Sequence, residues 1–280
     1  MLRTETADTS FGRNVLIPYN GETAASRTPT GRCEPGEYGR RRSTVTSNTV
    51  LSSLPVRVFD RLFPLMKRVT LLQEEFLFQP DDDVEFIYFP ESAAVSEFRI
   101  LEDGRIVEVA VIGRDGAIGL SKLFHSASIQ NCVQVLQAGN AVRMNSFETQ
   151  RVIKQDLQIA FCFYPHIDSY IRRISQKIVC NLYHSVRARF CTWLLMVRDR
   201  CDQEILRLTH EQIAKALGVY RPRITSIARE LKNRNIIHYS RGGITVLDRP
   251  AIESLTCVCY EENRDRMEPE ADRNDGVTVH

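Results

Sequence analysis

Arginine side chains are concentrated on one side of a short segment near the carboxyl end of the sequence. Arg221, Arg223 and Arg229 fall on the polar side of a helical pattern whose apolar side carries Ile224 and Ile227. A guanidinium can donate two parallel hydrogen bonds to the edge of guanine, or it can pair with a phosphate. This spacing is therefore typical of a helix that reads DNA. The other candidate DNA contacts are Thr209, Tyr220, Ser226, Ser240 and Arg241.

The local charge favours the same partner. Residues 205–250 hold nine basic and three acidic residues, a formal charge of +6, whereas the whole chain carries only +2. Such a concentration suits the phosphate backbone of a nucleic acid. We therefore predict double-stranded DNA as a partner.

The cysteines offer a second chemistry. Cys257 and Cys259 form a Cys-x-Cys pair, whose thiolates could hold zinc or an iron–sulfur centre. The pair is accompanied by no second Cys-x-x-Cys and by no histidine at zinc-finger spacing. We predict buried, reduced thiols with no metal and no cofactor, and keep a thiol- or metal-based redox sensor at this pair as an alternative function. Four further cysteines on predicted helices could approach it: Cys162, Cys180, Cys191 and Cys201.

Catalytic patterns are weak. The sequence has no phosphate-binding glycine loop, nucleophile elbow or paired metal-ligand motif. Glu108, Asp115 and His125 could act as an acid–base cluster only if the fold brought them together. We predict that the chain has no catalytic residues and is not an enzyme.

The basic segment requires two short helices joined by a turn. Thr209 can cap the first helix, and Gly218 can form the turn before the second. Beyond them, residues 236–240 and 244–247 are rich in β-branched residues and are joined through residues 241–243, which predicts a hairpin. Together these elements predict a winged helix-turn-helix.

The amino-terminal half is dominated by short strand-like runs separated by turn residues. Their number and interval predict a small antiparallel barrel or jelly roll, preceded by a helix over residues 49–66 that is interrupted at Pro55. The predicted strands are residues 70–78, 85–89, 94–101, 105–112, 132–136 and 141–145.

Between the two halves, residues 166–200 have a helical pattern. Its first part places apolar residues at alternating steps of four and three, which is the seam of a short coiled coil ending in a polar residue. Such a stripe could pack on its own domain or on a second copy of the chain. The seam consists of Ile167, Ile171, Ile174, Ile178 and Asn181.

Two segments resemble one known family. LTHEQIAKALGVYRPRITSIARELKNRNIIHYSRGGITVLD is similar to the DNA-binding domain of the Crp/Fnr transcription regulators, and FIYFPESAAVSEFRILEDGRIVEVAVIGRDGAIGL resembles their sensor barrel. The resemblance covers roughly residues 48–260. It implies an α+β fold with an amino-terminal antiparallel β jelly-roll barrel of the cyclic-nucleotide-binding type, a long dimerisation helix and a carboxyl-terminal winged helix-turn-helix. It also implies a homodimer paired through the seam, with a joint at residues 182–185.

The expected organisation has five parts. They are a disordered tail (1–47), the sensor barrel (48–150), the connecting and dimerisation helix (151–184), the winged helix-turn-helix (185–254) and an acidic carboxyl-terminal tail (255–280). RNA polymerase and a small-molecule effector of unknown identity are further candidate partners. No apolar run is long enough to span a membrane and the first residues lack a secretory signal, so we expect a cytoplasmic protein with no membrane partner.

Departures from the family pattern carry information. Leu120 stands where members that bind cyclic nucleotides have a glutamate, and Gln130 and Asn131 replace their phosphate-binding pair. We predict that the barrel does not bind cyclic AMP or cyclic GMP in the usual manner. In the second helix Arg221 matches a guanine-reading arginine, whereas Pro222 lacks the family's carboxylate, so the DNA target should differ. A cyclic-nucleotide signalling module that does not bind DNA is a further alternative.

Overall fold

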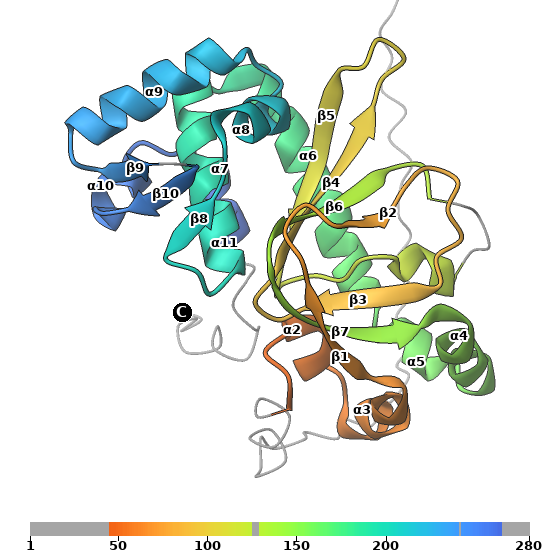
Figure 1. The fold of residues 1–280 in the computed structure, drawn as a ribbon. Coiled ribbons are helices and arrows are strands. Elements are labelled where there is room, and N and C mark those ends of the chain that lie inside the picture. The colour runs from red at the N-terminus through yellow and green to blue at the C-terminus, as the bar shows by residue number, and fades with distance from the viewer. Residues whose placement is uncertain (1–44, 125–128, 241, 265–280) are drawn as a thin grey trace, which may run out of the picture. The chain divides into compact units, whose positions relative to one another are not determined.

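The structure is a computed structural model that describes residues 45–124, 129–240 and 242–264 (Figure 1). The predicted amino-terminal tail therefore lies almost wholly outside the described residues, as do His125, Arg241 and residues 265–280. No helix of the described part is long and apolar enough to cross a membrane.

Within residues 45–124 and 129–145, seven antiparallel strands form two sheets. One sheet has the order β1 (Lys67–Leu71), β7 (Gly139–Asn145), β3 (Phe86–Pro90), and the other has the order β2 (Phe76–Phe78), β6 (Cys132–Gln137), β4 (Ala94–Ile100), β5 (Ile106–Ile112). In β3, Ile87 and Phe89 are buried whereas Phe86 and Tyr88 are half-buried, because successive residues of a strand point to opposite faces. The predicted antiparallel barrel is confirmed.

The predicted strand over residues 70–78 was wrong, because two strands occupy this stretch. β1 pairs with β7, and β2 pairs with β6 in the other sheet. The chain changes sheets through a turn in which Glu74 adopts a positive φ of 65° and the Glu75 carboxylate accepts a hydrogen bond from the Leu72 backbone N–H (2.8 Å). No glycine or proline marks this corner in the sequence.

Short helices precede the barrel. α2 (Thr49–Ser52) and α3 (Val56–Leu62) are separated at Pro55, as predicted, and η1 (Phe63–Leu65) follows. Asn48 caps α2 and also donates hydrogen bonds to the carbonyls of Pro90 (2.8 Å) and Gly116 (2.9 Å). One buried amide therefore attaches this helical segment to the barrel. Three further short helices, η2 (Leu120–Leu123), α4 (Ser146–Gln155) and α5 (Gln158–Phe161), complete this half.

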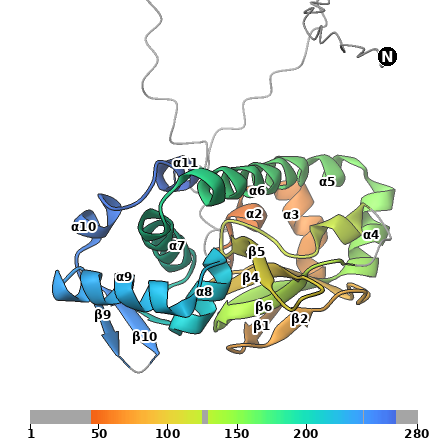
Figure 2. The same ribbon diagram turned by 90° about the horizontal axis from the view of Figure 1, so that it is seen from above.

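Two long helices connect the halves. α6 (Tyr164–Tyr183) ends at His184, and α7 (Val186–Arg200) starts after Ser185, whose side chain accepts a hydrogen bond from the Ala188 backbone N–H. Figure 2 shows α6 passing along the strands of the barrel. The break between the helices falls within the predicted joint at residues 182–185.

Buried ion pairs attach both long helices to β5 and the loop after it. The Glu108 carboxylate accepts hydrogen bonds from Lys177 of α6 (2.6 Å) and from the indole of Trp193 of α7 (2.7 Å). Asp115 accepts from Arg173 of α6 and from Arg200 of α7. Glu108 and Asp115 therefore belong to two separate networks and do not form the shared acid–base cluster that was considered from the sequence.

The carboxyl-terminal half contains α8 (His210–Leu217), α9 (Arg221–Asn233) and a three-stranded sheet. Its order is β8 (Ile205–Arg207), β10 (Gly243–Val246), β9 (Ile237–Ser240). The hairpin of β9 and β10 was predicted from the sequence, but β8 was not. α10 (Arg249–Glu253) and α11 (Cys259–Arg264) follow.

Candidate DNA interface

The turn between α8 and α9 has the local geometry that the sequence pattern predicted. Thr209 caps α8 in a reciprocal capping box with Gln212, and Gly218 ends α8 in the left-handed conformation at φ 64°. Ala214 is buried where α8 packs on α9, because only a small side chain allows the two helices to approach closely. The caps and the turn that define this pair of helices are therefore formed by residues close to one another in the sequence.

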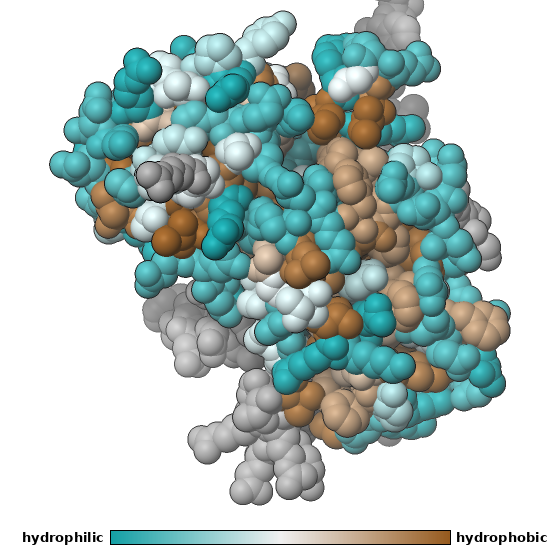
Figure 3. Space-filling model, in the orientation of Figure 1, coloured by the Kyte–Doolittle hydropathy of each residue, from teal (hydrophilic) through white to brown (hydrophobic). Residues whose placement is uncertain are grey.

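α9 has two distinct sides. Ile224, Ile227 and Leu231 are buried in a core shared with α7 and α8, at exposed fractions of 0–4%. Arg221, Arg223, Ser226 and Arg229 are exposed on the opposite side, and the surface over α9 is mainly hydrophilic in Figure 3. The apolar underside thus fixes the helix so that its guanidinium groups face solvent.

The three arginines of α9 are available for a partner. In the part of the chain that the structure describes, no carboxylate lies within 4.0 Å of the guanidinium groups of Arg221, Arg223 or Arg229. At the start of the helix Pro222 occupies the first turn, and Tyr220 precedes it with a side chain 88% exposed. This end of α9 is therefore open, positively charged and uncapped by any described side chain.

Part of the local positive charge is neutralised within the protein. Arg249 pairs with Asp199 (2.8 Å) and Glu253 (2.8 Å), and Arg234 lies 3.8 Å from Glu230. The high charge of residues 205–250 therefore overstates the charge offered to DNA. Among the described residues of this segment, the arginines without an acidic partner are concentrated on α9.

His210 holds the start of α9 against α8 and the wing, a role that no sequence pattern predicted. Its Nδ1 lies 3.0 Å from the Thr225 hydroxyl of α9, and its ring stacks on Tyr239 of the wing strand β9 at 4.2 Å between centroids. Burial, and then the charge of Arg221, lower the pKa of His210. A neutral imidazole thus joins α8, the start of α9 and the wing in one contact.

The remaining predicted DNA contacts lie at the edges of this surface. Thr209 is exposed at the start of α8, and Ser240 is exposed at the end of β9. Ser240 pairs with Gly243 in the register of the hairpin, so these two residues flank the tip of the wing. Arg241 lies outside the described residues.

A pocket lies between the barrel and α6, and the three residues that depart from the cyclic-nucleotide pattern, Leu120, Gln130 and Asn131, line it. Glu97 also lines it and accepts hydrogen bonds from Asn131 (2.8 Å) and from the Tyr170 hydroxyl (2.6 Å). Burial, followed by the charge of Glu97, raises the pKa of Tyr170.

The only described guanidinium that lines this pocket, Arg173, is paired with Asp115 at 2.6 Å. A phosphate placed there would meet the carboxylate of Glu97 and no unpaired arginine among the described residues. This arrangement disfavours an anionic ligand.

Comparison with known proteins supports the same interpretation. Residues 188–255 match the family described as a Crp-like helix-turn-helix domain. The chain is 24% identical over 217 residues to the global nitrogen regulator of a Nostoc species, an alignment that covers 72% of this chain and 94% of the relative.

Solved structures share the fold. A protein from Eubacterium rectale assigned to the Crp/Fnr family of transcriptional regulators superposes with a TM-score of 0.59 at 17% identity, covering 75% of this chain and 98% of the other. FixK2 from Bradyrhizobium japonicum superposes with a TM-score of 0.57 at 16% identity, covering 69% and 98%.

An antiparallel barrel followed by a winged helix-turn-helix with an outward-facing basic helix defines a DNA-binding transcription regulator. The carboxyl-terminal domain thus matches the Crp-like helix-turn-helix family, and the relatives support a transcription regulator of the Crp/Fnr type.

Proposed function

We propose that the protein binds a two-fold symmetric DNA site as a homodimer and inserts α9 into the major groove. The observation that carries this proposal is the pair of exposed arginines, Arg221 and Arg223, at the start of a helix whose underside is buried; neither has an acidic partner among the described residues. Two such helices related by a dimer axis would contact major grooves about one helical turn apart.

Each candidate residue has a role that follows from its position. Arg221 opens α9 and has the reach to read guanine through O6 and N7. Pro222 has no side-chain acceptor, and the Ser226 hydroxyl is short, so these two positions offer weaker base contacts. Arg223 and Arg229 suit phosphates, which set the register of the complex without conveying sequence. Phosphate contacts are also proposed for Thr209, Tyr220, Ser240 and Arg241.

The dimer would pair through α6. Ile171 and Ile178 are each 55% exposed on this helix, and Asn181 is exposed at the last seam position, whereas Ile167 and Ile174 are half-buried. Burial of a leucine or isoleucine side chain from water stabilises a contact by about 1.5–3 kcal/mol. A second copy of α6 would cover this stripe, with the polar asparagine specifying the register.

The pocket between barrel and α6 is the candidate effector site. Because its lining pairs Arg173 internally and presents Glu97, we propose that any effector differs from a cyclic nucleotide bound through its phosphate. A contact with RNA polymerase, a cytoplasmic location and the absence of catalysis remain predictions that accompany the regulator assignment.

DNA reading is tested with sites obtained by mapping bound DNA across the source genome. In fluorescence anisotropy, Arg221→Ala should lower affinity for the mapped site by about 1–3 kcal/mol and leave binding to random DNA nearly unchanged. Arg229→Ala should weaken both DNAs alike and reduce the salt slope by about one. Arg151→Ala, on the exposed surface of α4, is the control. Equal losses on both DNAs for Arg221→Ala would contradict its proposed role.

Pairing is tested separately by light scattering coupled to size exclusion. Ile178→Asp should convert the dimer to monomer, because it places a charge in the seam. Ile100→Asp is a matched control, since Ile100 of β4 has a similar exposed fraction, 51% against 55%. Monomeric wild-type protein, or dimers in both variants, would contradict pairing through α6.

A further inference from the structure

Four side chains capable of binding a metal meet at the joint between α6 and α7. Cys180 belongs to the last turns of α6, His184 follows that helix, Cys257 precedes α11 and Cys259 begins it. Their ligand atoms, three sulfurs and one imidazole nitrogen, all lie within 4.8 Å of one another. The three cysteines are buried and the histidine is half-buried.

The distances fit a single tetrahedral ion. The sulfur atoms of Cys180 and Cys257 are 3.6 Å apart, and the Cys259 sulfur is 3.4 Å from His184 Nδ1. Ligands around tetrahedral zinc are separated by about 3.8 Å for two sulfurs and about 3.5 Å for sulfur and nitrogen, from the usual zinc–ligand bond lengths. A polynuclear iron–sulfur cluster is larger than one ion and would hold its thiolates farther apart.

We propose that Cys180, His184, Cys257 and Cys259 bind one zinc ion. Three thiolates and one imidazole form a closed Cys3His set, the type found in structural zinc sites. Soft sulfur ligands select zinc over magnesium or calcium, which prefer oxygen.

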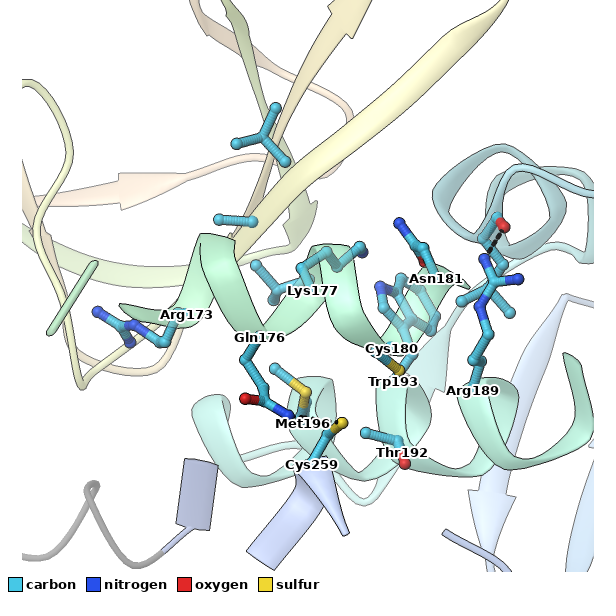
Figure 4. A pocket seen from close by; sticks show the side chains of 14 residues that line it. Arg173, Gln176, Lys177, Cys180, Asn181, Arg189, Thr192, Trp193, Met196 and Cys259 are labelled. Atoms are coloured by element: carbon cyan, nitrogen blue, oxygen red, sulfur yellow. Dashed lines mark hydrogen bonds between the residues drawn. The ribbon is translucent and has the colours of Figure 1, made fainter. Parts of the chain in front are cut away.

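Neighbouring polar groups are placed as supports for such ligands. Gln176 donates a side-chain hydrogen bond to the Cys259 sulfur (2.9 Å). The Thr192 hydroxyl accepts from the Cys257 backbone N–H (3.1 Å) and lies 3.2 Å from the Cys257 sulfur, so its own proton can be donated to that sulfur. Hydrogen bonds of this kind stabilise thiolates and orient metal ligands. Figure 4 shows Gln176 and Thr192 beside Cys180 and Cys259 in the space between α6 and α7.

A buried arginine supplies compensating charge. Zinc with three thiolates carries a net charge of −1, and Arg189 of α7, 9% exposed, lines the same pocket as Cys180 and Cys259. Its Nε has no hydrogen-bond partner among the described residues, while its terminal nitrogen donates to the carbonyl of Leu217 at the end of α8. Arg189 thus connects the proposed site to the helix-turn-helix.

The site would fasten the end of the proposed dimerisation helix to the end of the DNA-binding domain. Cys180 and His184 come from α6 and its joint, whereas Cys257 and Cys259 come from the segment after α10, and Thr192 belongs to α7 between them. Binding of zinc would therefore restrict the angle between α6 and α7. This consequence rests on the proposed function, whereas zinc binding itself does not.

Metal analysis of purified full-length protein tests the site. We expect about one zinc per chain in the wild type and in Cys201→Ser, whose buried thiol directly follows α7 and lies outside the site, and a loss of most of this zinc in Cys257→Ser and His184→Ala. Cobalt(II) chloride added to the zinc-free protein should give the visible absorption of a tetrahedral ion and a thiolate charge-transfer band. Gln176→Ala should retain the site but lower its zinc affinity by about 10- to 100-fold.

Alkylation of the wild type avoids dependence on variants that fail to fold. Cys180, Cys257 and Cys259 should react with iodoacetamide much faster after a chelator is added, as mass spectrometry of peptides would show. The proposal is overturned by wild-type protein without zinc affinity, by equal zinc in Cys257→Ser, by a polynuclear iron spectrum, or by a Cys180–Cys257 disulfide in place of the ion.

DNA binding is measured in the same samples. Chelation should weaken binding to the mapped site by about 5- to 150-fold, the usual range for coupling between two sites. If zinc binds as described but its removal leaves DNA affinity unchanged, the proposal that zinc restricts the angle between α6 and α7 for DNA binding is wrong. If no specific DNA binding is found with or without zinc, the proposed function fails and the metal site is judged by the metal measurements.

Discussion

Replacement of one buried carboxylate, Asp115→Asn, should destabilise the protein strongly. The Asp115 side chain is 5% exposed and lies between two guanidinium groups. Arg200, with a side chain 0% exposed, contacts it through two nitrogens at 3.0 and 2.8 Å, and Arg173 contacts it at 2.6 Å. Without the carboxylate, two buried cations of like charge would remain.

The magnitude follows from this geometry. Removing one partner of a buried ion pair costs about 3–5 kcal/mol, because the remaining charge has neither water nor a counter-ion. The matched control is Asp168→Asn on α6, where the pair with Arg172 has the same chemistry but both side chains are 59% exposed. An exposed pair contributes about 0–1 kcal/mol. The two variants should therefore differ by several kcal/mol.

Urea unfolding followed by tryptophan fluorescence measures this difference. Trp193 is the single tryptophan of the sequence and is buried in α7, so its emission reports the region that Arg200 and Asp115 hold together. Equal losses of unfolding free energy in Asp115→Asn and Asp168→Asn would refute the reasoning.

The same carboxylate predicts a pH dependence. Burial alone would raise the pKa of Asp115, but the charges of Arg200 and Arg173 outweigh it and hold this pKa below its ordinary value. The stabilisation is therefore complete above the unfolded pKa of about 3.9 and is lost as pH falls through the folded value. The difference in unfolding free energy between wild type and Asp115→Asn should therefore decrease below about pH 4. A difference that increases there would contradict a lowered pKa for Asp115.

Three further predictions concern the winged domain and its attachment. Because burial lowers the pKa of His210, the unfolding free energy of the wild type should decrease as pH falls below about 6.5. In urea unfolding at several pH values, this decrease should be smaller in His210→Gln, and equal decreases in the two proteins would contradict the prediction. Gly218→Ala should lower the unfolding free energy by about 1–2 kcal/mol in the same assay, because the backbone at this residue has a φ of 64°. A Cβ there would meet no atom within 4 Å, so backbone strain and not a steric clash is the expected cause. An unchanged unfolding free energy would exclude that strain. Glu108→Gln should shift the fluorescence emission of Trp193, whose indole donates to this carboxylate, and should lower the unfolding free energy by about 3 kcal/mol, because the carboxylate is 1% exposed. An unshifted emission spectrum would show that the environment of the indole does not depend on the Glu108 charge.

Local patterns in the sequence were sufficient for the helix-turn-helix. Capping by Thr209, the turn at Gly218 and the apolar stripe of Ile224 and Ile227 each depend on residues within about four positions of one another. The alternation of the strands and the helix break at Pro55 are equally local. These features were predicted correctly because backbone hydrogen bonding and side-chain periodicity act over such short separations.

Other features depended on contacts between distant segments. β8 has only three residues and becomes a strand because it pairs with β10. The corner at Glu74 arises because β1 and β2 pair with strands in different sheets, and nothing in its residue types marks it.

The proposed metal ligands show the same division most clearly. The sequence displayed Cys257 and Cys259 as a pair and Cys180 as a residue that could approach it, but His184 carried no local signal as a partner. Cys180 and Cys257 are separated by 77 residues, and their sulfurs meet because α6, α7 and the segment after α10 pack together. Residue type and spacing along the chain determined which groups could read DNA, whereas tertiary packing alone decided which thiols and imidazole share one site.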